Sequence, residues 1–187
     1  RNILIDCGEG SQIQMRKYRI KFQKINLILI SHLHGDHYFG LAGLLSSFIL
    51  LGRTSRLQVI CPKGLKNIIL SQIEIGNAKI PFEIIWKEIE LKEKELLYED
   101  KVIEVYGFPM NHRIQTHGFE VREKKKARNF IPEKIQELKI SIKEIGAIKK
   151  GEPLIRDGKE VPVEVYSKDS KRPLSYSFSA DNRIQEK

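Results

Sequence analysis

The sequence has 187 residues, with 33 Lys and Arg against 24 Asp and Glu, which gives a formal net charge of +9. Hydrophobic residues make up 41% and charged residues 30%, the balance of a globular domain with a buried core. No apolar run approaches the roughly 20 residues that a membrane-spanning helix needs, so the composition argues against a membrane partner. The excess of positive charge favours a polyanionic partner such as nucleic acid.

The cysteine content points to a reducing environment. Cys7 and Cys61 lie far apart in the sequence and have no metal-type spacing. They do not indicate a disulfide scaffold, and we therefore expect a cytoplasmic protein.

The first half of the chain alternates apolar strand-like runs with helical segments. We predict strands at residues 2–6, 26–30, 57–61, 82–85, 88–91 and 102–108, and helices at residues 12–17, 40–51 and 64–74. Within residues 26–30 the run Leu27–Ile30 is continuously apolar, which is typical of a strand buried on both faces. Strands mixed with helices predict two sheets covered by helices.

The second half changes character after a further predicted strand at residues 118–122. The segment 122–158 is rich in Lys and Glu and poor in aromatic residues, with helical patterns at 132–138 and 142–148. It reads as a surface insertion. A last strand is predicted at 176–179, followed by Ala180 and Asp181. Because the chain opens inside a strand and stops soon after Asp181, we expect further parts of the protein at both ends.

The densest functional signal is the run H-L-H-G-D-H, residues 32–37, directly after the apolar run at 26–30. Three of the five histidines in the chain fall in this loop, which makes a chance cluster improbable. A loop at the end of a buried strand is a rigid platform, and imidazole and carboxylate are typical zinc ligands. His32 and His34 could face one metal ion, and Asp36 and His37 a second. Such paired sites clamp both oxygens of a phosphodiester displacement.

Two further residues are candidates because each follows a predicted strand. His112 would supply the ligand that a first metal ion still needs, and Asp181 would be a bridging carboxylate, although an Asp at a strand end is more often a turn former. His117 lies five residues after His112, and we expect it to pack or to face solvent.

The pattern H-x-H-x-D-H after an apolar strand resembles the metallo-β-lactamase superfamily, and three further features resemble its ribonuclease Z family. Residues 6–12 match that family's D-C-G-E-G-[ST]-Q signature, residues 37–45 its H-x-x-G-L-x-G-L-L continuation, and residues 112–120 its H-…-G-[FY]-…-E motif. The ending S-A-D-N is only a loose match, and the resemblance is weak from Lys125 to Arg172. The resemblance implies an α/β fold, an αββα four-layer sandwich of two mixed sheets flanked by helices. It implies a single domain over 1–187 that is incomplete at both ends.

The same resemblance implies the site. It makes His32, His34 and His112 ligands of a first zinc ion, Asp36 and His37 ligands of a second, and Asp181 the bridge. Asp36 is also the implied proton acceptor for the attacking water, and Asp6 would orient the ligands from behind. The implied activity is a zinc-dependent endoribonuclease, a homodimer, which removes the 3′ trailer of precursor tRNA by hydroxide attack on a phosphodiester.

The sequence departs from the family pattern in two places. The family has further C-terminal histidines, one completing the second zinc site and one assisting the leaving group, and this chain ends before any such residue. The segment 123–151 takes the place of a tRNA-gripping arm but lacks the usual Gly-Pro-rich sequence. It is basic, and a solvated charged face is an equal alternative to RNA binding. The candidate RNA-binding residues are Arg122, Lys124, Lys125, Lys126 and Arg128.

Three alternatives stay open on the residues alone. One is another hydrolase of the same fold, a phosphodiesterase or arylsulfatase type, or one acting on a thioester, a lactam or a cyclic nucleotide. Another is a non-catalytic RNA-binding relative. A purely structural zinc site fits less well, because such sites commonly use Cys ligands and neither cysteine is placed to serve.

Overall fold

The computed structural model describes residues 2–149 and 151–183, which form two compact units. Within that range the first unit comprises residues 2–99, 104–121 and 176–183, and the second comprises 100–103 and 122–175. The segment expected as an insertion, 123–151, falls in the second unit. Among the described residues, no helix combines the length and the apolar character needed to cross a bilayer.

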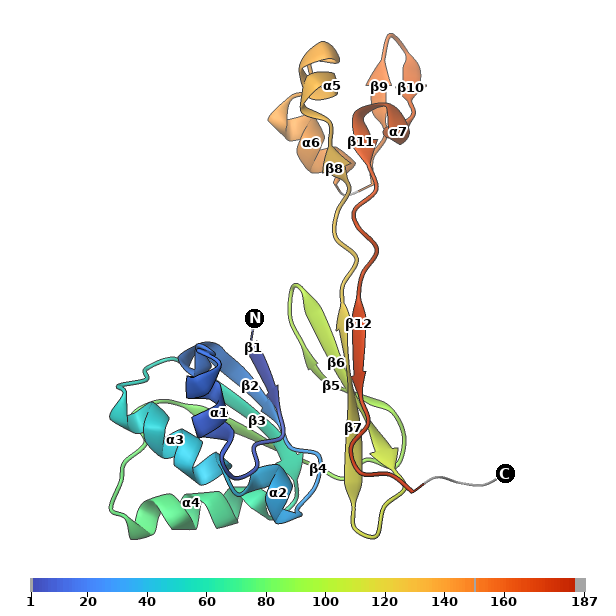
Figure 1. Ribbon diagram of the computed structural model, residues 1–187. Coiled ribbons are helices and arrows are strands. Elements are labelled where there is room, and N and C mark those ends of the chain that lie inside the picture. Colours follow the sequence, from blue (N-terminus) through green and yellow to red (C-terminus); the bar gives the residue numbers. More distant parts are fainter. Residues whose placement is uncertain (1, 150, 184–187) are drawn as a thin grey trace. The chain divides into compact units, whose positions relative to one another are not determined.

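The first sheet of the first unit is parallel and carries the buried apolar runs (Figure 1). Its strands, in spatial order, are β1 (Asn2–Ile5), β2 (Ile25–Leu29), β3 (Leu57–Pro62) and β4 (Ile84–Ile89). All three pairings are parallel. Parallel strands need crossover connections, and the helices between them supply these. The continuous apolar run of β2 is therefore buried, as the sequence predicts.

Helices cover one face of this sheet (Figure 1). They are α1 (Ser11–Lys17), α3 (Leu41–Leu50) and α4 (Leu65–Ile75). In α3, Leu41, Leu44, Leu45 and Phe48 recur at helical spacing and are fully buried. They pack with the sheet into one core cluster. This confirms the helices predicted near these positions.

The second sheet has the order β12-β7-β6-β5. Its strands are β5 (Glu95–Glu99), β6 (Ile103–Met110), β7 (Thr116–Glu123) and β12 (Ser175–Phe178). His117 joins this sheet to the end of β2, because its backbone N–H donates to the carbonyl of Ser31 at 3.0 Å. The described part of this unit thus supplies three layers, helices and two sheets, with the loops after β2 and β6 at the same end (Figure 1).

The second unit has a small core of its own around Ile140, Leu154 and Tyr166. It contains β8 (Asn129–Phe130), α5 (Pro132–Glu137), α6 (Ile142–Ile148), β9 (Leu154–Arg156), β10 (Lys159–Val161), α7 (Val163–Tyr166) and β11 (Ser167–Lys168). The two predicted helices are confirmed. At α6 the Ser141 hydroxyl accepts from the backbone N–H of Glu144, whose side chain reaches back to Ser141, a capping box.

One local prediction is wrong, and two elements have no counterpart among the predictions. The separate strands predicted at 82–85 and 88–91 are one strand, β4, which among the described residues pairs with β3 alone and so tolerates Lys87 and Glu88 at the sheet edge. The strand β5 lies in a charged stretch whose sequence does not indicate a strand, and its pairing with β6 stabilises it. The loop after β2 contains a one-turn helix, α2 (Gly35–Tyr38), closed by a bond from the Phe39 N–H to the Gly35 carbonyl.

Both cysteines should be unreactive in the folded protein. Cys7 and Cys61 are free and fully buried, and burial raises their thiol pKa values to about 11 and about 12. The thiols of the unfolded chain ionise at lower pH than the buried ones. The free energy of unfolding should therefore fall as pH rises from about 9 towards these pKa values. We expect no reaction with Ellman's reagent near pH 8 and reaction of both thiols in denaturant. Rapid native labelling would contradict the buried placement.

Candidate metal centre

The candidate site is built on the loop that leaves β2. Ser31 and His32 follow the strand directly and are fully buried, whereas Asp36 lies in α2 and is 69% exposed. The second sheet adds His112, two residues after β6, and Asp181, three residues after β12. Three chain segments therefore meet at one end of the first unit.

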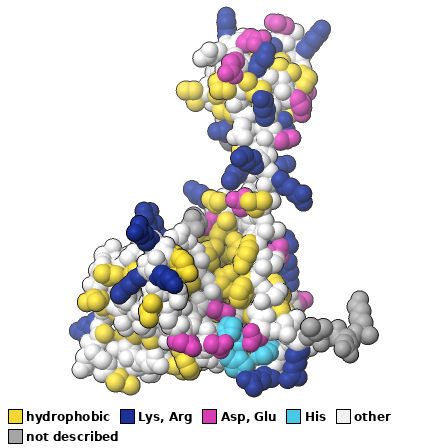
Figure 2. All heavy atoms as spheres, in the orientation of Figure 1, with side chains coloured by type: hydrophobic (Ala, Val, Ile, Leu, Met, Phe, Trp, Pro, Cys, Tyr) yellow, Lys and Arg dark blue, Asp and Glu magenta, His cyan; other side chains and the backbone are white. Residues whose placement is uncertain are grey.

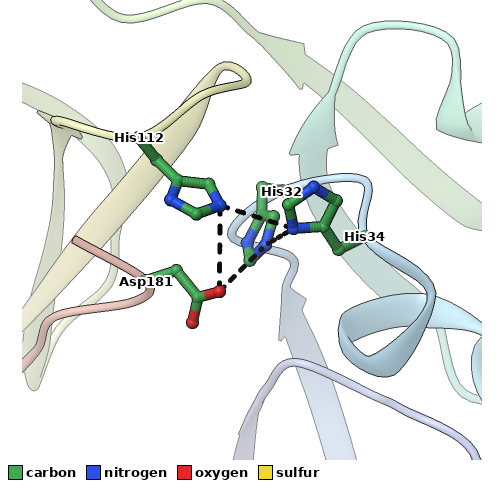
Figure 3. A group of neighbouring side chains, drawn as sticks. All are labelled: His32, His34, His112 and Asp181. Carbon is green, nitrogen blue, oxygen red and sulfur yellow. Dashed lines mark hydrogen bonds and ion pairs between the residues drawn. The ribbon is translucent and has the colours of Figure 1, made fainter. Parts of the chain in front are cut away.

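Four side chains converge at the centre of this site (Figure 3). One ligand atom from each of His32, His34, His112 and Asp181 lies within 4.8 Å of the others. Nδ1 of His34 is 3.0 Å from Nε2 of His32 and 3.4 Å from Nε2 of His112. Oδ2 of Asp181 is 3.9 Å from Nε2 of His32 and 3.8 Å from Nε2 of His112. The sequence prediction named all four residues, and the structure brings them together.

A second group of donors lies beside the first and shares Asp181 with it. Nε2 of His37 is 3.7 Å from Oδ1 of Asp181 and 3.4 Å from Oδ2 of Asp36. The two carboxylate oxygens of Asp181 thus face different groups, Oδ2 towards His32 and His112 and Oδ1 towards His37. This is the arrangement expected of a carboxylate between two cation positions.

Asp6 and Ser31 hold two of the imidazoles from behind. The Ser31 hydroxyl donates to Oδ2 of Asp6 at 2.8 Å, so its oxygen accepts from Nδ1 of His32 at 2.9 Å. Nδ1 of His37 lies 2.7 Å from the same Asp6 oxygen. Both rings are therefore protonated at Nδ1, and Nε2 is left as a lone-pair donor towards the site. Oδ1 of Asp6 accepts from the Ser31 backbone N–H at 2.7 Å, which fixes the carboxylate.

Burial keeps His32 neutral. Desolvation, followed by the nearby His37 and His34, lowers the pKa of His32 to about 4. A neutral imidazole is the form that binds a metal ion.

The donor set fits zinc. Ligand nitrogens bound tetrahedrally to zinc at about 2.0–2.1 Å lie about 3.3 Å from one another. The separations of 3.0 and 3.4 Å between the facing nitrogens bracket that value. The residues present therefore suit a divalent ion, and three imidazoles with a carboxylate favour zinc over magnesium or calcium.

Close backbone packing positions the loop. A Cβ on Gly8 would lie 2.0 Å from the backbone oxygen of Asp36, and one on Gly40 would lie 2.1 Å from the backbone oxygen of Gly8. The backbone N–H of Cys7 donates to the carbonyl of His37 at 2.7 Å. Gly8 and Gly40 thus allow the backbones of two loops to pack against each other. This gives a physical reason for the glycines of these two motifs, one in the D-C-G-E-G segment and one in the continuation after His37, to which the sequence analysis assigned no role.

Gly8→Ala should displace the Asp36 loop, because backbone atoms cannot yield as a flexible side chain can. We expect catalytic activity to fall about 100-fold or more, since a shift of about 1 Å at a reacting group has that effect. Steady-state rates and zinc content measure it. Gly146→Ala is the matched control, because a Cβ there meets nothing within 4 Å. Wild-type rates in Gly8→Ala would mean that the loop adapts without cost.

The remaining candidates lie elsewhere. His117 is fully buried, and its ring contacts the Ser31 carbonyl at Nδ1 and the Leu91 backbone N–H at Nε2, which is a packing role. The candidate RNA-binding residues fall in the second unit, where Arg128 is bonded to Asp169 and Ser167. Sequence reasoning missed Ser31, whose only signal was its position directly before His32.

Comparisons with known proteins were made at the levels of family, sequence and structure. A family model described as Anti-Pycsar protein Apyc1 matches residues 1–121. Ribonuclease Z of Bacteroides thetaiotaomicron is 37% identical over 179 residues, 95% of this chain and 57% of the relative. Ribonuclease Z of Azobacteroides pseudotrichonymphae is 44% identical over 121 residues, 65% of this chain and 42% of the relative. The chain thus spans only part of the length of these curated relatives.

Solved structures agree with the sequence relatives. Human tRNase Z, short form, superposes with a TM-score of 0.60 at 34% identity, over 65% of this chain and 53% of the human chain. A long-form RNase Z from yeast superposes with a TM-score of 0.54 at 16% identity, over 68% of this chain and 24% of the yeast chain, which supports the fold alone. The predicted fold class and the resemblance to ribonuclease Z are confirmed. The chain therefore belongs to the family described as Anti-Pycsar protein Apyc1, is similar in sequence to ribonuclease Z and shares the fold of human tRNase Z, short form.

Proposed function

We propose that this chain carries the metal centre of a zinc-dependent endoribonuclease that removes the 3′ trailer of precursor tRNA. The observation that carries the proposal is the placement of Asp181, whose two oxygens face separate donor groups. Paired metal sites of this kind are used by nucleases and phosphatases. The names of the curated relatives and the net charge of +9 support RNA as the substrate.

The ligand roles follow from the two donor groups. His32, His34 and His112 would hold one zinc ion, Asp36 and His37 a second, and Asp181 would bridge them. Zinc bound there would acidify a water molecule and neutralise charge on the phosphate oxygens. Asp6 and Ser31 keep the lone pairs of His32 and His37 turned towards the site. Asp36, the most exposed of the carboxylates, would accept the proton of the attacking water.

Recognition of the tRNA body would fall to the second unit. Lys125, Lys126 and Arg128 line a hollow of about 250 Å³ together with Lys149. Their positively charged side chains would contact phosphates and not bases. We therefore propose that the tRNA is recognised by its shape, through Arg122, Lys124, Lys125, Lys126 and Arg128. The logarithm of the binding constant should then fall linearly with the logarithm of the salt concentration. We further propose a cytoplasmic homodimer in which one subunit grips tRNA that the other cleaves.

A substrate panel tests the function. The full-length protein is loaded with zinc and given a 3′-extended precursor tRNA, bis-p-nitrophenyl phosphate and a cyclic nucleotide in parallel. We expect trailer release from the precursor with far higher kcat/KM than for the small esters, and two zinc ions per chain by elemental analysis.

Two outcomes would contradict the proposal. Hydrolysis of a small ester or cyclic nucleotide with intact precursor tRNA would assign the site to another hydrolase of the same fold. Binding of tRNA without cleavage, and without zinc, would indicate a non-catalytic relative.

A further inference from the structure

An exposed arginine, Arg113, borders the metal centre and has no role in the assignment above. It follows His112 in the loop between β6 and β7, and its Nε donates to Nε2 of His34 at 3.2 Å. Figure 2 shows Lys and Arg side chains directly beside the histidine cluster of the first unit. In the structure this contact holds the guanidinium at the border of the cluster.

The two edges of the His34 ring have different surroundings. Nδ1 faces His32 and His112, the interior of the donor cluster. Nε2 faces Arg113, outside the cluster. A metal ion bound at Nδ1 would leave the ring proton on Nε2, which could then no longer accept from Arg113, so the guanidinium at the outer border of the site would be free to bind another acceptor.

The charge of Arg113 is not compensated by protein. Over residues 2–149 and 151–183, no carboxylate forms an ion pair with it. A guanidinium is charged at every physiological pH. A permanent cation beside a site for divalent cations is repelled by them, and an anion bound between the two would relieve that repulsion.

We propose that Arg113 binds a non-bridging oxygen of the scissile phosphate, which makes it a substrate-binding residue. The guanidinium matches phosphate oxygens in geometry, and the bonds are charge-assisted. The inference deepens the proposed function and relies on it only for the phosphate being part of an RNA chain. No proton or covalent bond changes place at Arg113.

A binding measurement tests the inference without catalysis. Inorganic phosphate is titrated into the zinc-loaded full chain and followed by calorimetry. We expect Arg113→Ala to weaken phosphate binding about 10- to 100-fold, the effect of losing a hydrogen bond to a charged group, and Arg113→Lys to recover part of it. Arg16→Ala, which removes an exposed arginine of α1, is the matched control and should change the dissociation constant less than about twofold.

The substrate can be changed instead of the protein. A precursor tRNA with a neutral methylphosphonate at the cleavage site carries no charged oxygen for Arg113 to bind. Arg113→Ala should weaken binding of the natural precursor but leave binding of the methylphosphonate precursor unchanged. Equal losses with both RNAs would overturn the inference and assign Arg113 to another phosphate.

Zinc content separates this role from a structural one. If Arg113 only supported His34, Arg113→Ala would lose zinc affinity, and that result would overturn the inference, as would phosphate binding equal to that of Arg16→Ala. Failure of the proposed function looks different: the wild-type protein would leave precursor tRNA intact while Arg113-dependent phosphate binding persisted.

Discussion

Asp36→Ala should abolish cleavage of precursor tRNA while leaving tRNA binding nearly unchanged. We expect a loss of about 1,000-fold or more, because the substitution removes a general base, worth about 100- to 10,000-fold, and a metal ligand together. Asp36 is 69% exposed, so its loss leaves no buried cavity and should not unfold the chain. Single-turnover cleavage and filter binding of the same RNA measure the two quantities.

Asp36→Asn separates the two roles of this carboxylate. The amide keeps the shape and one oxygen but cannot take a proton from water at neutral pH. The variant should therefore lose the general-base contribution, about 100- to 10,000-fold, while keeping more zinc than Asp36→Ala. Asp157→Asn, in the second unit and at a φ of 49° that Asn tolerates, is the matched control for loss of one carboxylate charge. Near-normal turnover in Asp36→Asn would remove Asp36 from the mechanism.

The metal loop was the part of the site most accessible to sequence reasoning. His32, His34, Asp36 and His37 are close in the chain and follow a buried strand, so local spacing alone brings them together. His112 and Asp181 come from other strands; each was a candidate because it follows a predicted strand, and the family resemblance implied the same roles for them. Arg113 and Ser31 were missed, because what they do depends on which edge of a neighbouring ring they face. A sequence does not carry that orientation.

Errors in the fold have the same origin. The two wrong strands in the 82–91 region came from treating charged residues as strand ends, although an edge strand tolerates them. In the second unit, β8 and β11 have two residues each and exist only through pairing with each other. Periodicity needs longer windows than that. The helices α5 and α6 were predictable because a proline and a capping box mark their starts.

Asp6→Asn should lower zinc affinity about 10- to 100-fold, the usual effect of removing a group that orients a metal ligand. Oδ2 of Asp6 accepts from both the Ser31 hydroxyl and Nδ1 of His37. An amide nitrogen in that place accepts neither, and both rings lose their fixed orientation. The substitution should not strain the backbone, because Asp6 has a φ of 57° and Asn also adopts this left-handed conformation. Zinc titration with a competing chelator measures the loss.

Ser31→Ala makes this test more specific, because the two variants should lower zinc affinity at different positions of the site. The Ser31 hydroxyl lies between Asp6 and His32, and its oxygen is 2.9 Å from Nδ1 of His32. The same oxygen is 3.4 Å from Nδ1 of His37, which contacts Asp6 directly at 2.7 Å. Ser31→Ala should therefore lower the affinity for the zinc ion that His32 would bind and leave the affinity for the other zinc ion unchanged. Asp6→Asn should lower both affinities. Equal zinc binding in Asp6→Asn and wild type would mean that the imidazoles are oriented by the ions alone. The hydrogen bonds behind them would then be a consequence of the fold with no part in metal affinity.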